Sequence, residues 1–161
     1  MKNDSSEQLA LPEVSQIGMV VEDLDGPMDF FRSVLGIGPF EVHDMPVASV
    51  WDRGEEKPIR ARLAFANAGQ VQIELIQILE GDSFHLEFLR EHGPGIHHLG
   101  FRVRDFQAKL ELAKRMGFSV LQAGPGGRFY AYLDTRDHAG IIVELIEEMD
   151  PGGLGSSAMP G

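Results

Sequence analysis

Four residues with side chains that can bind a metal ion occupy equivalent places in two similar halves of the chain: Gln16, Glu74, His98 and Glu144. Gln16 begins the run Gln-Ile-Gly-Met-x-Val-x-Asp, and His98 begins the run His-Leu-Gly-Phe-x-Val-x-Asp. Each run is followed by a second shared phrase, Ile-Glu-Leu-Ile or Val-Glu-Leu-Ile, and the spacings are 74 − 16 = 58 and 144 − 98 = 46 residues. Because such self-similarity is the signature of a repeated structural unit, we predict two copies of one unit.

The chemistry that this set of residues could perform is the binding of a divalent cation. Two carboxylates, one amide oxygen and one imidazole form a mostly oxygen site with a net charge of −2. Such a set suits a cation of borderline hardness, namely Zn, Co, Ni or Mn, with water in the remaining positions. The ligand types leave the choice among these metals open. Water positions on the ion would leave room for neighbouring oxygens of a small-molecule substrate.

Other interpretations of the same residues compete with a metal site. A carboxylate within an apolar strand is unusual, because burying an unpaired charge is costly, but both glutamates could instead face solvent. Gln16 could be an ordinary polar residue at the edge of a sheet. The equivalent places of the two glutamates in the repeats favour the metal site. His97 competes with His98, but side chains alternate along a strand and the alignment of the repeats selects His98.

The elements that must position these side chains follow one order in both halves: strand, helix and three strands. In the first half, the patterns predict a helix capped by Asp25 and ended by Gly36, with strands over 14–21, 39–50, 59–67 and 71–79. In the second half, they predict a helix between Asp105 and Gly117, with strands over 97–103, 118–123, 128–134 and 140–147. The Gly-rich loop at 124–127 is followed by a strand, which argues against a nucleotide-binding loop.

Length and composition favour one globular domain. The chain has 161 residues, of which 43% are hydrophobic and 24% are charged. We assign the domain to residues 13–148, with module one over about 13–80, a linking helix over 82–92 and module two over about 95–148. The polar arm at 1–12 and the Gly- and Ser-rich tail at 149–161 are predicted to be disordered.

Charge and residue content exclude several classes of function. The net charge of 14 − 25 = −11 disfavours nucleic acid and anionic membranes as partners, because both require a basic surface. The chain has no Cys, which excludes disulfides, thiolate nucleophiles and Cys-ligated zinc. The first residues lack the apolar core of a signal peptide, and no run approaches the ~18 apolar residues of a membrane span. We therefore expect a cytoplasmic protein.

Paired β-α-β-β-β units with His or Gln on the first strand and Glu on the last resemble the vicinal oxygen chelate superfamily. That superfamily includes glyoxalase I, methylmalonyl-CoA epimerase, extradiol dioxygenases and bleomycin-resistance proteins. The resemblance covers residues 14–148, and it is strongest to epimerase-like and glyoxalase I-like members through Gly-Ile-His-His-Leu-Gly at 95–100 and Gly-Ile-Ile-Val-Glu-Leu at 140–145. It implies an α+β fold whose two βαβββ modules form curved mixed β-sheets around a metal-binding cleft.

Three positions depart from the pattern of these relatives. The epimerases usually carry His where this chain has Gln16, although Gln at that place resembles some glyoxalases I. The epimerases also carry a second catalytic Glu at the position that we align with Ala61. Glyoxalase I carries a glutathione-binding Arg where this chain has Val20. The resemblance therefore indicates the superfamily more firmly than one substrate.

The resemblance implies a metal-dependent isomerase or lyase that moves a proton at a carbon next to a carbonyl. Glu144 is the candidate base and Glu74 the second candidate, because a carboxylate beside a metal can accept a proton. Arg102, Arg128 and Tyr130 are the candidate substrate-binding residues. A homodimer acting on an acyl-CoA-like or glyoxalase-like molecule is implied as well. Two alternatives stay open: an Fe(II) dioxygenase, which needs two His and one carboxylate, and a non-catalytic protein that sequesters a drug or metabolite.

Overall fold

The computed structural model describes residues 7–149 and contains two modules joined by one helix. The first module consists of β1 (Gln16–Val20), α1 (Asp25–Ser33), β2 (Glu41–Asp44), β3 (Ala48–Asp52), β4 (Glu55–Ala68) and β5 (Val71–Glu80). The linking helix is α2 (Phe84–His92). The second module consists of β6 (Gly95–Val103), α3 (Phe106–Arg115), β7 (Val120–Ala123), the 3-10 turn η1 (Pro125–Gly127), β8 (Tyr130–Leu133), α4 (Arg136–Ala139) and β9 (Ile142–Glu147). The predicted plan is present in both halves, with short additional elements.

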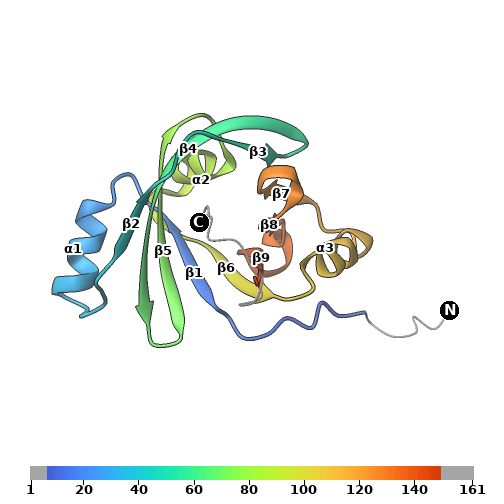
Figure 1. Ribbon diagram of the computed structural model, residues 1–161, viewed down its shortest axis with the longest axis horizontal. Coiled ribbons are helices and arrows are strands. Elements are labelled where there is room, and N and C mark those ends of the chain that lie inside the picture. The colour runs from blue at the N-terminus through green and yellow to red at the C-terminus, as the bar shows by residue number, and fades with distance from the viewer. Residues whose placement is uncertain (1–6, 150–161) are drawn as a thin grey trace.

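The strands form one curved sheet that closes on itself (Figure 1). The order is β2-β4-β3-β7-β8-β9-β6-β1-β5, and β4 also pairs with β5. Because β4 pairs with β5 along one edge and with β3 and then β2 along the other, β2 stands outside a ring made by the remaining strands. The sheet is mixed, with parallel β1–β5 and β6–β9 pairs among antiparallel ones. The predicted α+β class with curved mixed sheets is therefore confirmed.

The two modules meet at their first strands. In each module the first and last strands are parallel, and in both pairs a Gly lies opposite a Glu: Gly18 faces Glu74, and Gly100 faces Glu144. The first strands β1 and β6 are antiparallel neighbours. The four predicted ligands therefore stand on four adjacent strands, in the order β9, β6, β1 and β5.

Side-chain alternation separates an outer face, which the helices cover, from an inner face. Leu75 and Leu145, which follow the two glutamates in sequence, are fully buried in the outer hydrophobic cores of their modules. Helix α1 covers the core of the first module with partly buried apolar residues, and α3 covers that of the second with Phe106 and Leu110. Figure 1 shows these two helices outside the ring, at opposite sides of the molecule. The two glutamates consequently point into the ring.

The segment predicted as one strand over 39–50 forms β2 and most of β3, and much of the predicted loop over 52–58 is the start of β4. β3 pairs with β4, and its last two residues also pair with Gln122 and Ala123 of β7. This short pairing closes the ring between the two modules. The sequence prediction missed it because no local pattern encodes a pairing between strands so distant along the chain.

The helix starts differ slightly from the prediction. α1 begins at Asp25 with Leu24 as its N-cap. The carboxylate of Asp25 therefore lies within the first turn, where it interacts favourably with the helix dipole. α3 begins after Asp105 as predicted, although the Asp105 side chain makes no capping hydrogen bond. α1 ends at Ser33, before the predicted stop at Gly36.

The predicted arm and tail lie only partly within the described residues. Residues 7–12 form neither helix nor strand, and Leu9 and Leu11 pack against the core of the second module. Residues 1–6 and 150–161, which make up the rest of the arm and nearly all of the tail, fall outside the described part. Between residues 7 and 149, no helix is long and apolar enough to cross a membrane.

Candidate metal centre

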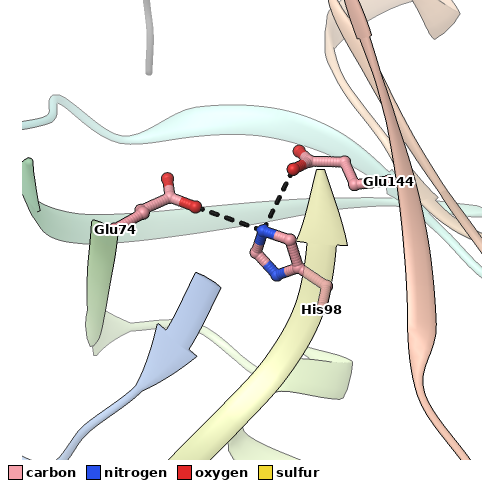
Figure 2. A group of neighbouring side chains, drawn as sticks. All are labelled: Glu74, His98 and Glu144. Carbon is pink, nitrogen blue, oxygen red and sulfur yellow. Dashed lines mark ion pairs between the residues drawn. The ribbon is translucent and has the colours of Figure 1, made fainter. Parts of the chain in front are cut away.

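The side chains of Glu74, His98 and Glu144 converge inside the ring in a buried group that could hold a metal ion. His98 Nε2 lies 3.3 Å from Glu74 Oε2 and 3.0 Å from Glu144 Oε2, and Figure 2 shows both carboxylates directed at this nitrogen. One possible ligand atom from each residue lies within 4.8 Å of the others. Gln16 Oε1 lies 3.2 Å from His98 Nε2. The structure thus brings the four predicted ligands together, and each residue is at most 5% exposed.

Two glycines make room for these side chains. Gly18 lies opposite His98, and a Cβ atom on Gly18 would lie 1.9 Å from Cε1 of the His98 ring. Gly100 lies opposite Gln16, and a Cβ atom there would lie 3.0 Å from Gln16 Cβ. Each repeat therefore carries one ligand side chain and, two residues later, the glycine that accommodates the ligand of the other repeat. Glycine within a strand often marks a close approach of this kind.

Replacing Gly18 by Ala is expected to displace the His98 ring. The new methyl group would overlap the ring, and overpacking a buried site costs typically about 1–3 kcal/mol. We expect a loss of unfolding free energy of that size in urea denaturation, together with weaker zinc binding in calorimetry. Gly95→Ala on β6, the strand that carries His98, is the control, since a Cβ atom there meets nothing within 4 Å. Equal effects of the two substitutions would contradict this steric explanation.

The donor atoms fit a divalent cation. Gln16 turns its oxygen toward His98 Nε2, while its nitrogen donates to Gln72 Oε1 at 2.9 Å. Rotating the amide by 180° would instead place the nitrogen 3.0 Å from Glu74 Oε2 and 3.1 Å from Glu144 Oε2. The first orientation presents a set of acceptor atoms that repel one another unless a cation lies among them. The second orientation would also bring the amide nitrogen 3.2 Å from His98 Nε2, where two donors would meet if His98 is protonated, so the first orientation is the one that suits a cation at this place.

Charge within the site changes the protonation of His98 and Glu144. Burial by itself lowers the pKa of His98, but the charges of Glu144 and Glu74 and their hydrogen bonds outweigh burial and raise this pKa to about 9. Burial raises the pKa of the Glu144 carboxyl above its usual value, while His98 acts in the opposite direction. In the metal-free protein at neutral pH, His98 is therefore protonated and supplies the positive charge between the two carboxyl groups.

This protonation predicts how metal affinity depends on pH. A metal must displace the proton from His98, because only the neutral imidazole can bind it. Since the pKa of His98 is raised to about 9, apparent zinc affinity should rise by up to about tenfold per pH unit toward that value and level off above it. Calorimetric titrations at several pH values, in buffers with different ionisation enthalpies, should detect about one released proton per zinc ion. An affinity that does not change with pH would contradict the prediction.

His97, the predicted competitor of His98, lies behind it and is not directed at the carboxylates. His97 Nδ1 lies 3.1 Å from His98 Nδ1, on the far side of the ring from Nε2. Tyr132 packs edge-on against His98, with ring centroids 5.0 Å apart. A hydrogen bond to the second nitrogen of a metal-binding His fixes its tautomer and its orientation. His97 and Tyr132 therefore hold the His98 ring in place.

A cavity of about 190 Å³, here named the outer cavity, adjoins the cluster. It is lined by Gln16, Glu74 and Glu144 and by two predicted substrate-binding residues, Arg102 and Tyr130. Burial raises the pKa of Tyr130 to about 12, so its hydroxyl stays protonated and can donate a hydrogen bond. A molecule in this cavity would contact the carboxylates and the guanidinium of Arg102 together.

Arg128, the third predicted substrate-binding residue, does not line the outer cavity. Its guanidinium lies 3.6 Å from Glu147 Oε1 and 5.6 Å from the centre of the Phe129 ring, and its side chain is 59% exposed. Phe129 and Glu147 do line the cavity. Arg128 is therefore one residue removed from the cavity wall.

A second cavity of about 90 Å³, here named the inner cavity, shares Glu74, Tyr130 and Glu144 with the outer one. The carboxylates therefore stand where the two cavities adjoin. The inner cavity is also lined by two buried polar residues that the sequence analysis did not single out, His85 of α2 and Gln122 of β7. Neither belongs to the repeated motif, so comparing the two halves gave no signal for them.

Comparison with known proteins agrees with this architecture. Residues 15–132 match a family model described as Glyoxalase/Bleomycin resistance protein/Dioxygenase superfamily. The chain is 30% identical over 139 residues to the uncharacterised protein YqjC of Bacillus subtilis (strain 168), covering 83% of this chain and 91% of that protein. It is 27% identical over 147 residues to the mitochondrial methylmalonyl-CoA epimerase of Mus musculus, covering 88% of this chain and 76% of that protein.

A solved structure shows the same fold. The methylmalonyl-CoA epimerase of Mycobacterium tuberculosis matches with a TM-score of 0.64 and 25% identity, covering 92% of this chain and 95% of that chain. The match to the family model includes both first-strand motifs, at Gln16 and at His98. The resemblance drawn from the duplicated motif is therefore confirmed. The chain belongs to the glyoxalase, bleomycin resistance protein and dioxygenase superfamily, with methylmalonyl-CoA epimerases among its named relatives.

Proposed function

We propose that this protein is a divalent-metal-dependent isomerase that moves a proton at a carbon next to a carbonyl group, in an acyl-CoA-like or glyoxalase-like substrate. The observation that carries the proposal is the position of Glu144 and Glu74, buried beside His98 and exposed to both cavities. The identity of 27% to a methylmalonyl-CoA epimerase supports the same class of reaction.

The proposed metal ligands are Gln16, Glu74, His98 and Glu144. A divalent cation held by them would stabilise the negative charge that develops on a carbonyl oxygen when the neighbouring C–H bond breaks. Zn, Co, Ni and Mn all suit the donor set.

Glu144 is the proposed base, and Glu74 is the second candidate. Burial raises the pKa of Glu144 in the metal-free protein, and a carboxylate that a bound metal ion releases or holds loosely would act as the base. The carboxylate takes the proton from the α-carbon and the resulting acid returns it, so no other reactant is needed. Ala61 lies on the wall of the inner cavity and supplies no carboxylate there, which leaves the two ligand glutamates as the acid–base groups of our proposal.

The outer cavity is the proposed entrance for the body of the substrate. Arg102 lines this cavity, and we propose that its guanidinium binds an anionic or carbonyl group of the substrate. Its Nη2 lies 3.4 Å from Gln72 Oε1, so Gln72 links Arg102 to Gln16 of the cluster. Tyr130 is assigned a hydrogen bond to the substrate from the same wall.

The alternatives fit the site less well. An Fe(II) dioxygenase of the facial-triad kind uses two imidazoles and one carboxylate. Among the described residues, the converging group offers one imidazole and two carboxylates. A sequestering protein needs no such group of buried acids, whose burial without a cation is costly.

The test is solvent deuterium exchange. Protein loaded with zinc, cobalt, nickel or manganese is incubated in D₂O with a panel of acyl-CoA thioesters and 2-hydroxyketones, and mass spectrometry follows the α-carbon. We expect deuterium to enter at least one compound in a metal-dependent manner, with chelator-treated protein as the control. A folded, metal-loaded protein that exchanges no compound of the panel would remove the proposed function.

We also propose a homodimer. The outer surface of α1 and the turn after it carries Phe30, Val34 and Leu35, each at least half exposed, and clustered exposed apolar residues often mark an interaction surface. Sedimentation velocity should give a dimer mass, and Val34→Glu should shift it toward the monomer. A wild-type protein that sediments as a monomer at all concentrations would contradict the proposal.

A further inference from the structure

The inner cavity combines apolar walls with buried polar atoms that have no partner. Its walls include Val50, Leu63 and Ile76. His85 is 3% exposed and neither of its ring nitrogens has a hydrogen-bond partner within the described protein. Gln122 is 1% exposed, and its Oε1 likewise has none. Buried polar groups are normally paired, so two such groups lining one cavity point to a ligand that pairs with them.

The hydrogen-bonding capacity of these two residues is well defined. Gln122 Nε2 donates to the hydroxyl of Tyr130 at 3.1 Å, so the remaining group is its carbonyl oxygen, an acceptor. His85 stacks on His97 with ring centroids 4.8 Å apart and meets the edge of Tyr132 at 5.3 Å, which fixes its ring. Burial, with a smaller contribution from His98, lowers the pKa of His85 to about 3. The neutral ring offers one donor and one acceptor.

The lining of the cavity offers no side chain that would pair with an anion. Glu74 and Glu144 line it, and its lining within the described part of the chain contains no Arg or Lys. A carboxylate in the cavity would meet no cationic side chain, and the two acidic groups would offer it no partner even when a bound metal ion neutralises them. A hydroxyl group can both donate and accept, so it can satisfy the imidazole and the amide oxygen. The volume of about 90 Å³ corresponds to about three water-sized groups, which limits the occupant to a short chain.

We propose that the inner cavity selects substrates whose α-carbon carries a short, uncharged, hydroxyl-bearing substituent, and that His85 and Gln122 bind this hydroxyl. The inference rests on the proposed function in one respect, since it takes the substrate to be an acyl compound held beside Glu144. It goes beyond that function by naming the substituent and the residues that recognise it.

The test compares three coenzyme A thioesters, the butanoyl, 3-hydroxypropanoyl and succinyl compounds. Their α-carbons carry an ethyl, a hydroxymethyl and a carboxymethyl group, and the first two have nearly the same shape. With zinc-loaded protein, calorimetry gives the dissociation constants and deuterium exchange gives kcat/KM. We expect the hydroxymethyl compound to bind at least about tenfold more tightly than the ethyl compound, because a site built for a hydroxyl rejects the analogue that lacks it. The succinyl compound should bind most weakly.

Substitutions assign the preference to the two residues. His85→Leu and Gln122→Met remove the polar groups at nearly constant volume, and each should reduce the preference for the hydroxymethyl compound to about twofold or less. Gln77→Met is the matched control, because Gln77 Oε1 is also buried and has no hydrogen-bond partner among residues 7–149, but it does not line the inner cavity. This control should keep the full preference. Melting temperatures and zinc content verify that each variant is folded and loaded.

Binding and exchange together separate the two proposals. Equal binding of the ethyl and hydroxymethyl compounds by the wild type, or an undiminished preference in both variants, would overturn the hydroxyl subsite. Selective binding through His85 and Gln122 without any deuterium exchange would support the subsite and remove the proposed isomerase. Deuterium exchange without selectivity would support the proposed isomerase and overturn the hydroxyl subsite. A lack of binding by all three thioesters would also overturn the subsite.

Discussion

Replacing Glu144 by Gln is expected to lower the rate of α-proton exchange by about 10²–10⁴-fold, the range that a positioned acid–base group supplies. The substitution keeps the length of the side chain and one oxygen near His98 Nε2, but it removes the group that accepts the proton. Burial raises the pKa of Glu144 in the metal-free protein. A solvated carboxylate with an ordinary pKa would therefore be a weaker base in its place. The measurement is the rate of deuterium incorporation into the compound that exchanges fastest with the wild type.

Two further variants serve as comparisons for Glu144→Gln. Glu148→Gln, at an exposed side chain that pairs with Arg104 at the molecular surface, should exchange at the wild-type rate. Glu74→Gln should lose less activity than Glu144→Gln once both variants are fully loaded with zinc. Should Glu74→Gln prove the more damaging substitution at equal zinc content, the roles of the two carboxylates are reversed. A Glu144→Gln protein as active as the wild type would exclude Glu144 as the base.

The sequence predicted the group of candidate ligands because duplication supplied a register that a single motif lacks. Equating Gln16 with His98 aligned Gly18 with Gly100, and the shared Glu-Leu-Ile phrase placed Glu74 and Glu144 at equivalent positions of the two repeats. The structure brings the four side chains together through strand pairing. In each repeat the parallel register places the Glu opposite a Gly, and the antiparallel β1–β6 pair joins the two repeats. The catalytic and ligand roles of these residues stay predictions.

Features that depend on contacts outside the repeat could not be predicted in this way. The pairing of β3 with β7 joins segments about 70 residues apart, and nothing in either segment specifies the partner. His85 lies in the linking helix, where its helical spacing resembles that of an ordinary core residue, and Gln122 lies in a short strand. Only the closed ring places both beside the carboxylates. His97 was judged by strand alternation and by the alignment of the repeats, and neither shows that its ring reaches the second nitrogen of His98.

Replacing His98 by Ala is expected to have the largest effect on the metal-free protein, because Glu74 and Glu144 would lose the positive group between them. Removing one partner of a buried ion pair costs about 3–5 kcal/mol, so the free energy of unfolding at neutral pH should fall by that amount. Without His98, only the hydrogen bond with Tyr132 opposes the upward pKa shift that burial and the charge of Glu74 give Glu144. A carboxyl with a raised pKa binds its proton more tightly in the folded state, so the variant should regain stability as the pH falls through that pKa. Urea denaturation in the presence of a chelator, at about pH 5 and about pH 8, measures both effects.

Zinc titration of the same variant separates a ligand from a purely structural ion pair. Loss of an outer hydrogen-bond partner weakens metal binding by about 10–100-fold, so loss of a ligand should weaken it by more than about 100-fold. His98→Gln should recover part of this affinity, because it places in the second repeat the amide that Gln16 supplies in the first. His92→Ala, at a side chain that is 60% exposed, should bind zinc as the wild type does. If His98→Ala binds zinc as tightly as His92→Ala, the buried cluster is an ion-pair network and the metal-dependent function has no site.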